Sequence, residues 1–116
     1  MTKEKIVIPL GVKVQITSKA SLDKYGLDEQ MWLTMLRDQG WKCLICDKPS
    51  STGAYVVDHE HIRGYKKLPP EQKRLYVRGI CCWFCNHSYL GRGITLEKAR
   101  NMVAYLEAYA ARRPKK

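Results

Sequence analysis

Residues 43–46 read CLIC and residues 82–86 read CWFCN, so two Cys-x2-Cys pairs stand 35 residues apart. Each pair can place two thiolates on one tetrahedral metal ion. The chain has five cysteines, an odd number, and its N-terminus lacks the apolar run of a secretion signal, so a disulfide framework is disfavoured. We therefore expect one structural zinc ion rather than a set of buried, inert thiols. Its ligands would be Cys43, Cys46, Cys82 and Cys85.

The segment between the two pairs predicts a β-hairpin. Residues 54–57 and 75–81 are rich in strand-forming residues, and the loop that joins them contains Pro69 and Pro70. The loop is also basic, so the hairpin would carry a long positive tip that the zinc ion closes at its base. Cys81, the fifth cysteine, follows Ile80 at the end of the second strand, and we expect it to be a small buried residue rather than a ligand or a nucleophile.

Helices are predicted on both sides of the hairpin. Asp28 is a candidate N-cap for a helix that runs to Gln39 and stops at Gly40, and a short helix should follow Cys85. Thr95 would cap a last helix, whose apolar residues recur at helical spacing and form a stripe that we expect to pack on the domain. The stripe consists of Leu96, Ala99, Val103, Leu106 and Ala110.

The length of 116 residues suits one domain, and the mixture of helices and strands predicts an α+β fold. We expect an arm over 1–23, with β-forming residues that favour a short hairpin or an extended segment. A zinc-stapled domain would follow over 24–110, with a basic tail over 111–116. No apolar run is long enough to span a bilayer, so we expect a cytoplasmic protein.

The formal net charge of +10 is uneven along the chain. Residues 1–40 hold 6 basic and 5 acidic side chains, whereas residues 41–116 hold 15 and 6. An excess of this size attracts polyanions, because basic side chains that neutralise phosphates release counterions. DNA is therefore the first partner to consider, and a solubilising surface charge is the alternative. The basic residues expected to contact DNA are Arg63, Lys66, Lys67, Lys73, Arg74, Arg78 and Arg92.

The chemistry of the chain is concentrated in residues 58–61, which read DHEH, and in Asn86. The oxygens of Asp58 and Asn86 are hard ligands suited to Mg²⁺ or Mn²⁺, and a neutral His59 could take a proton from an attacking water. Neighbours in a regular strand point to opposite faces, so the strand must end or bulge at Asp58 and His59 for both to reach one site. The alternative for a lone His-x-His is a second zinc site or a polar strand end.

The order of these motifs resembles the recombination endonuclease VII family of phage proteins, within the HNH, ββα-metal or His-Me finger nucleases. Residues 43–46, 58–61 and 78–86 carry the resemblance, with support from the lead-in at 24–27 and the closing helix at 104–107. The resemblance implies a small ββα-metal nuclease domain with flanking helices, in which Asp58 and Asn86 hold a divalent ion, His59 is the general base and His61 contacts the scissile phosphate. An acidic residue of the family's junction-resolving member is replaced here by Tyr89, so water, substrate or His87 would complete the metal shell.

The resemblance implies a metal-dependent DNA endonuclease that resolves branched DNA or nicks it, with no membrane partner, located in a host bacterium if the gene belongs to a phage. Two alternatives stay open. One is a sequence-preferring HNH nicking enzyme linked to packaging or mobile elements, and the other is a zinc-bearing DNA-binding module that does not cut. Whether the protein is a monomer or a homodimer is open at this point.

Overall fold

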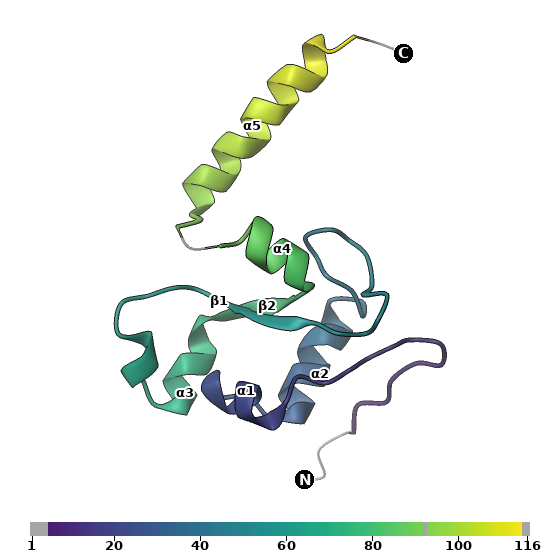
Figure 1. Ribbon diagram of the computed structural model, residues 1–116, viewed down its shortest axis with the longest axis vertical. Coiled ribbons are helices and arrows are strands. Elements are labelled where there is room, and N and C mark those ends of the chain that lie inside the picture. The colour runs from purple at the N-terminus through teal and green to yellow at the C-terminus, as the bar shows by residue number, and fades with distance from the viewer. Residues whose placement is uncertain (1–4, 92, 115–116) are drawn as a thin grey trace.

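The computed structural model of the protein describes residues 5–91 and 93–114. The described residues form five α-helices and one two-stranded antiparallel sheet (Figure 1), which confirms the predicted α+β fold. The helices are α1 (Lys19–Lys24), α2 (Glu29–Asp38), α3 (Pro70–Lys73), α4 (Trp83–Ser88) and α5 (Leu96–Arg112). The strands are β1 (Val56–His59) and β2 (Val77–Cys81), and two 3-10 turns, η1 (Tyr65–Lys67) and η2 (Arg74–Tyr76), flank α3.

Helix α2 forms where the sequence predicts it. The Asp28 carboxylate accepts a hydrogen bond from the backbone N–H of Met31 at 2.8 Å, which satisfies a donor that the first turn leaves unpaired. At the other end Gly40 adopts a left-handed φ of 78°, a conformation that favours glycine after a helix. The buried face of α2 carries Trp32, Leu33 and Leu36.

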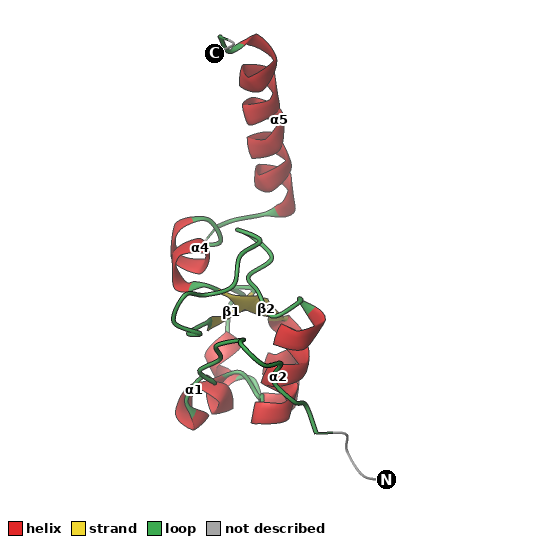
Figure 2. Cartoon of the chain, turned by 90° about the vertical axis from the view of Figure 1, so that its right-hand side faces the viewer, coloured by secondary structure: helices red, strands yellow, loops and turns green. Residues whose placement is uncertain are grey.

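The main core lies between α2 and one face of the β1–β2 sheet. Val57 and Ile80 are paired across the two strands and are both buried in this core. Gln39, directly after α2, holds the free edge of β2, because its side chain accepts from the Ile80 N–H at 2.9 Å and donates to the Ile80 carbonyl at 2.7 Å. The opposite side of the sheet is covered by α4 (Figure 2). The buried core residues are Leu22, Leu27, Trp32, Leu33, Leu36, Tyr55, Val57 and Ile80.

The β1–β2 hairpin carries the predicted irregularity at Asp58 and His59. Asp58 pairs with Gly79 and His59 pairs with Val77, so β2 has one extra residue, Arg78, between two neighbouring positions of β1. The predicted strand bounds need correction: β1 begins at Val56 rather than at residue 54, and β2 begins at Val77 rather than at residue 75. The residues just before β2 form η2 instead, and the basic tip contains short helices rather than an open loop.

The N-terminal segment runs along the body of the molecule as an extended arm. Over residues 5–17 it has no strand, and its sheet-like contact is a single parallel bridge between Gln15 and Ala54. Ile6, Val14 and Ile16 pack against the main core. Residues 19–23, predicted to belong to the arm, are part of α1, and the predicted arm residues 1–4 lie outside the described residues.

Helix α5 corrects one prediction. Thr95 caps it as expected, since the Thr95 hydroxyl accepts from the Lys98 N–H at 3.1 Å. None of its residues is buried, however, and the helix extends away from the rest of the molecule (Figures 1 and 2). The prediction that its apolar stripe packs on the domain is therefore wrong: α4 lies against the sheet, whereas α5 buries none of its residues. Among the described residues, no helix combines the length and the apolar character needed to cross a membrane.

Candidate active site and zinc site

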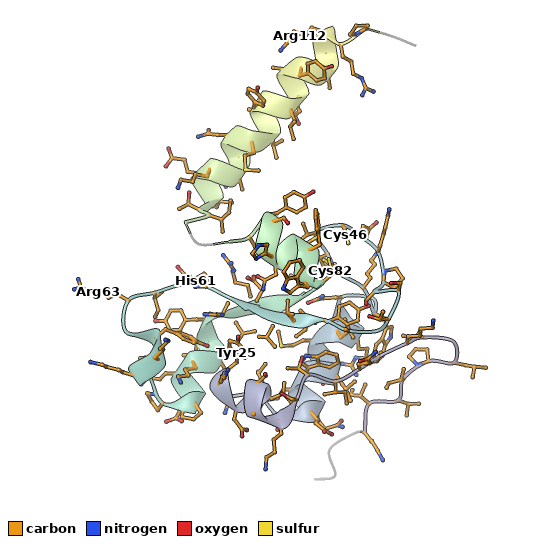
Figure 3. All side chains as sticks on the ribbon, viewed as in Figure 1. Tyr25, Cys46, His61, Arg63, Cys82 and Arg112 are labelled. Atoms are coloured by element: carbon orange, nitrogen blue, oxygen red, sulfur yellow. The ribbon has the colours of Figure 1, made fainter. Side chains whose placement is uncertain are left out.

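Four cysteine sulfurs gather where the hairpin meets α4. Cys43 and Cys46 lie between α2 and β1, Cys82 is the N-cap of α4 and Cys85 lies in its first turn. Their sulfur atoms all lie within 4.8 Å of one another, with 4.0 Å between Cys46 and Cys82 (Figure 3). Zinc–sulfur bonds of about 2.3 Å in a tetrahedron place sulfurs about 3.8 Å apart. The predicted four-cysteine group is thus positioned to bind a structural metal ion, and its all-thiolate chemistry fits zinc.

The protonation of these thiols depends on burial and on backbone donors. Burial raises the pKa of Cys43, but hydrogen bonds from the backbone of Cys46, Cys82 and Ile45 outweigh it and bring the pKa down to about 7. Burial raises the pKa of Cys85. Binding of an ion to all four sulfurs therefore releases protons, because each ligand must be a thiolate.

Cys81 lies outside the four-sulfur group, as predicted. It is 6% exposed and packs with Cys43 and Cys85 in a second small core. Burial, followed by the nearby charges of Cys43 and Asp58, raises the pKa of Cys81 to about 12. A protonated, buried thiol is a packing residue rather than a ligand.

Asp58 is held by Arg78, its neighbour across the hairpin bulge. Arg78 donates through Nε to Oδ2 at 2.8 Å and through Nη2 to Oδ1 at 2.9 Å, so both carboxylate oxygens are engaged. The Asp58 side chain is 3% exposed and that of Arg78 is 35% exposed. The hydrogen bonds to Asp58 raise the pKa of Arg78. The structure thus gives Arg78, an expected DNA contact, a carboxylate partner inside the protein.

His59 packs in a group of rings. Its imidazole stacks on Tyr65 with 4.5 Å between ring centres, and it lies 5.2 Å from the ring of Tyr25 and 4.6 Å from that of His61. Burial, followed by the charge on His61, lowers the pKa of His59 below its usual value of 6.5. The imidazole is therefore neutral near pH 7, the form that can accept a proton.

His61 and Asn86 meet at one pocket. The pocket has a volume of about 380 Å³ and is lined by His61, Trp83, Asn86, His87 and Gly91. The pocket lies between the segment that follows β1, which contains His61, and helix α4, which contains Trp83, Asn86 and His87. Two of the four predicted site residues thus line one cavity, and His59 contacts it through the ring of His61.

Two aromatic features of the site were not predicted. Trp83, between the cysteines of the second pair, lines the pocket, and the rings of Tyr25 and Tyr65 enclose His59. The sequence holds a signal for Trp83, because it directly follows Cys82, which is both a predicted metal ligand and the N-cap of α4. Trp83 is therefore the first residue of that helix. His87, which was considered for the metal shell, lines the pocket, whereas Tyr89, which replaces the family's acidic residue, packs edge-on against Phe84 with 5.6 Å between ring centres.

Five of the remaining predicted DNA contacts lie in the basic tip between β1 and β2. Arg63 points away from the body of the molecule (Figure 3), and Lys66 and Lys67 are exposed in η1. The Lys73 ammonium lies 5.8 Å from the centre of the Tyr65 ring. Arg74 is exposed. The position predicted at Arg92 lies outside the described residues.

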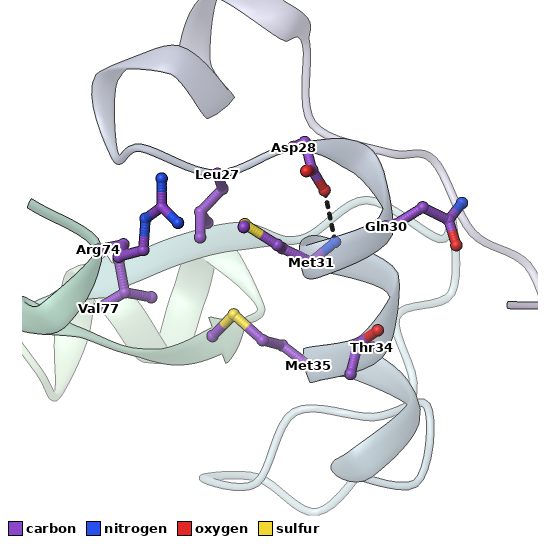
Figure 4. A pocket seen from close by; sticks show the side chains of 8 residues that line it. All are labelled: Leu27, Asp28, Gln30, Met31, Thr34, Met35, Arg74 and Val77. Carbon is purple, nitrogen blue, oxygen red and sulfur yellow. Dashed lines mark hydrogen bonds between the residues drawn. The ribbon is translucent and has the colours of Figure 1, made fainter. Parts of the chain in front are cut away.

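A second, apolar pocket of about 550 Å³ lies between α2 and the start of β2. Leu27, Met31, Met35 and Val77 supply its walls (Figure 4). Of the predicted site residues it contains Arg74 alone, and its carboxylate, from Asp28, is committed to capping α2. This pocket lacks the groups for hydrolysis, so the candidate active site is the smaller one beside α4.

Comparison with known families places most of the chain in one of them. The family model described as recombination endonuclease VII matches residues 18–108, from the N-cap of α1 to within α5. No curated protein and no solved structure gives a match. The matched segment contains the four cysteines, the DHEH motif and Asn86, and it covers most of the sequence. The chain therefore belongs to the recombination endonuclease VII family.

Proposed function

We propose that the chain is an HNH-type DNA endonuclease that hydrolyses phosphodiester bonds with the help of a divalent ion and prefers branched DNA. The observation that carries the proposal is the convergence of His61 and Asn86 on one pocket, with the neutral His59 in contact with His61. A net charge of +10 supports a DNA substrate. Family membership makes the protein an endonuclease, and the metal dependence and the branched substrate are our proposal.

Each site residue has a role in this proposal. His59 takes a proton from the water that attacks the phosphate, and His61, exposed at the pocket, binds a phosphate oxygen. The oxygens of Asp58 and Asn86 are suited to Mg²⁺ or Mn²⁺, and such an ion would offset the charge that develops on the leaving 3′ oxygen. The products would be a 5′-phosphate and a 3′-hydroxyl.

Arg78 supplies the positive charge beside Asp58 in this structure. A divalent ion at Asp58 would compete with it, because both carboxylate oxygens already accept from the guanidinium. Displaced from Asp58, Arg78 would be free to bind a DNA phosphate, so its predicted role in DNA binding is compatible with its position in the hairpin. The divalent ion would then balance the negative charge of Asp58 in place of the Arg78 guanidinium.

The Arg78→Ala variant is expected to be less stable by about 3 kcal/mol, because it leaves a buried carboxylate without a counter-charge. The lower end of the usual range applies, since the Arg78 side chain is 35% exposed. Mg²⁺ or Mn²⁺ should restore part of this loss. The measurement is urea unfolding with and without the added ion.

Arg63→Ala is the matched control for this prediction, because Arg63 is exposed on the tip. It should unfold like the wild type in both conditions. If Arg78→Ala is as stable as the wild type, the Arg78–Asp58 ion pair contributes nothing to the free energy of unfolding. A destabilised variant that no divalent ion rescues would exclude Asp58 as a ligand.

The decisive test of function is cleavage of supercoiled plasmid, linear duplex and a four-way junction, each with Mg²⁺, with Mn²⁺ or without added ion. We expect cleavage to require the ion and to be fastest on the junction. Fastest cleavage at one sequence of the linear duplex would support the nicking-enzyme alternative. Binding without any cleavage under these conditions would support the non-catalytic module.

The basic tip is expected to set the salt dependence of DNA binding. Each phosphate contact contributes a slope of about −0.9 to the plot of log affinity against log salt concentration. Replacing the four tip residues by alanine should therefore flatten the slope by up to about 3.6, measured by fluorescence anisotropy between low and physiological salt. The four residues are Lys66, Lys67, Lys73 and Arg74.

A variant in which four exposed lysines outside the tip are replaced by alanine is the control for net charge. These lysines are Lys5, Lys19, Lys24 and Lys48. If both variants flatten the slope equally, the effect comes from total charge and the tip does not contact phosphate.

A further inference from the structure

Trp83 is a large aromatic residue placed in water at the candidate active site. It is the first residue of α4 and is 62% exposed, whereas Trp32 is fully buried in the core. Its indole lines the same pocket as His61 and Asn86. A tryptophan in this position keeps a wide apolar surface next to the residues proposed to bind the scissile phosphate.

The indole is held in a defined orientation. It lies parallel to the imidazole of His87, one turn later on α4, with 4.7 Å between ring centres and 8° between ring planes. The backbone below it is fixed by Cys82, the N-cap, whose sulfur accepts from the Cys85 N–H at 3.4 Å. With one ring face on His87 and the two flanking cysteines in the four-sulfur group, the exposed surface is ordered before any ligand arrives.

The chemistry of the surroundings points to a nucleobase as the group that covers Trp83. The chain carries a net charge of +10, and the pocket wall supplies imidazole and amide groups that can bond phosphate and base edges. Aromatic side chains bind nucleobases by stacking, which contributes substantially for each base and tolerates any sequence. In a continuous duplex both faces of every base are already covered by neighbouring bases, so only an interrupted or single-stranded region offers a free face.

We propose that Trp83 is a stacking platform for an unpaired nucleobase next to the cleaved phosphate, and that it selects DNA with an interrupted helix over continuous duplex. The proposal deepens the proposed function and rests on it, because it assigns Trp83 to the same site. It names a residue that sets substrate preference rather than one that carries out the hydrolysis.

Phe84 provides a matched control on the same helix. It is exposed to a similar degree, 57%, but it packs edge-on against Tyr89 and is not among the residues that line the pocket. Removal of either aromatic ring exposes the same helix and leaves the four cysteines in place. Only Trp83 should affect recognition of an unpaired base.

The test compares the affinity for a duplex with a short single-stranded gap with the affinity for the same duplex fully paired. Binding is measured by fluorescence anisotropy without added divalent ion, so that no strand is cut. Trp83→Ala should lower the ratio of the two affinities by about 5- to 150-fold, as expected for the loss of one stacked base. Trp83→Phe should keep most of the ratio, and Phe84→Ala should keep all of it. Zinc content and the melting temperature establish that each variant is folded.

Tryptophan fluorescence gives a second readout. Trp32 is fully buried and Trp41 is half-buried, so quenching by the gapped DNA should come from Trp83 and disappear in Trp83→Phe. An unchanged affinity ratio in Trp83→Ala, or quenching that persists in Trp83→Phe, would overturn the proposal. If these results hold but the wild type cuts no DNA with Mg²⁺ or Mn²⁺, the proposed function fails and the stacking site stands.

Discussion

The Cys43→Ser variant is expected to lose its bound zinc and its cooperative unfolding transition together. Cys43 is fully buried, and its sulfur belongs to the four-sulfur group that joins the segment after α2 to the start of α4. A structural zinc ion contributes about 10–16 kcal/mol of folding free energy in small zinc domains, whereas whole domains are stable by about 5–15 kcal/mol. If the ion is lost together with the Cys43 ligand, the free energy of folding that is lost is comparable to the stability of a whole domain.

The second core of this protein makes the effect larger still. That core consists of Cys43, Cys81 and Cys85, with Cys82 and Leu90 packed against it, so little apolar surface would hold α4 on the sheet without the ion. Zinc per chain should be measured by elemental analysis, and unfolding by circular dichroism during a urea titration. We expect about one zinc in the wild type and no sigmoidal transition in Cys43→Ser.

Cys81→Ala is the matched control for the zinc prediction. Cys81 lies in the same core but outside the four-sulfur group, so this variant should keep its zinc and unfold cooperatively at slightly lower urea. A full equivalent of zinc in Cys43→Ser, or a normal transition without zinc, would contradict the proposed role of the ion.

The His59→Ala variant is expected to cleave DNA about 10²- to 10⁴-fold more slowly than the wild type, the usual contribution of a general base. The structure supports this role because burial keeps His59 neutral and its ring contacts that of His61 at the pocket. The rate should be measured in a single turnover, with enzyme in excess over a labelled four-way junction, so that product release does not limit it.

Three measurements distinguish the loss of the general base from the loss of the folded structure. His59→Ala should keep its zinc, and its DNA affinity should stay near that of the wild type, because neither depends on the imidazole. The cleavage rate of His61→Ala should lie between that of the wild type and that of His59→Ala if His61 only binds the phosphate and takes no proton. Cleavage by His59→Ala at the wild-type rate would remove His59 from the mechanism and leave His61 as the candidate base.

Several elements were predictable because their signals are local. Asp28 and Thr95 cap α2 and α5 through backbone groups three residues away, so each helix start could be predicted from a few neighbouring letters. The strand bounds were less accurate, because a strand extends only as far as its partner allows. Residues 54 and 55 precede β1: Ala54 bridges to Gln15 of the arm, and the Tyr55 hydroxyl accepts from the Ser50 N–H.

Contacts between distant residues were not predictable in the same way. Asp58 and Arg78 are twenty positions apart, and only the pairing of β1 with β2 brings the guanidinium onto the carboxylate. The sequence showed that Arg78 is a cation in a basic half of the chain, but the partner of a charge is decided by the fold. The stripe of α5 is similar, since periodicity indicates an apolar face without indicating what covers it, and in the structure none of its residues is buried.

The sequence by itself determined the family and which four cysteines could share a metal ion, and it supplied the residues proposed for catalysis, because these depend on residue type and spacing along the chain. The tertiary structure decided how that set is divided: Asp58 lies buried against Arg78, His59 lies among the rings of Tyr25 and Tyr65, and His61 and Asn86 line a pocket that also contains Trp83. The physical reason is that burial, ring stacking and ion pairing are set by distances between atoms, which arise only when β1, β2 and α4 pack around the four cysteines.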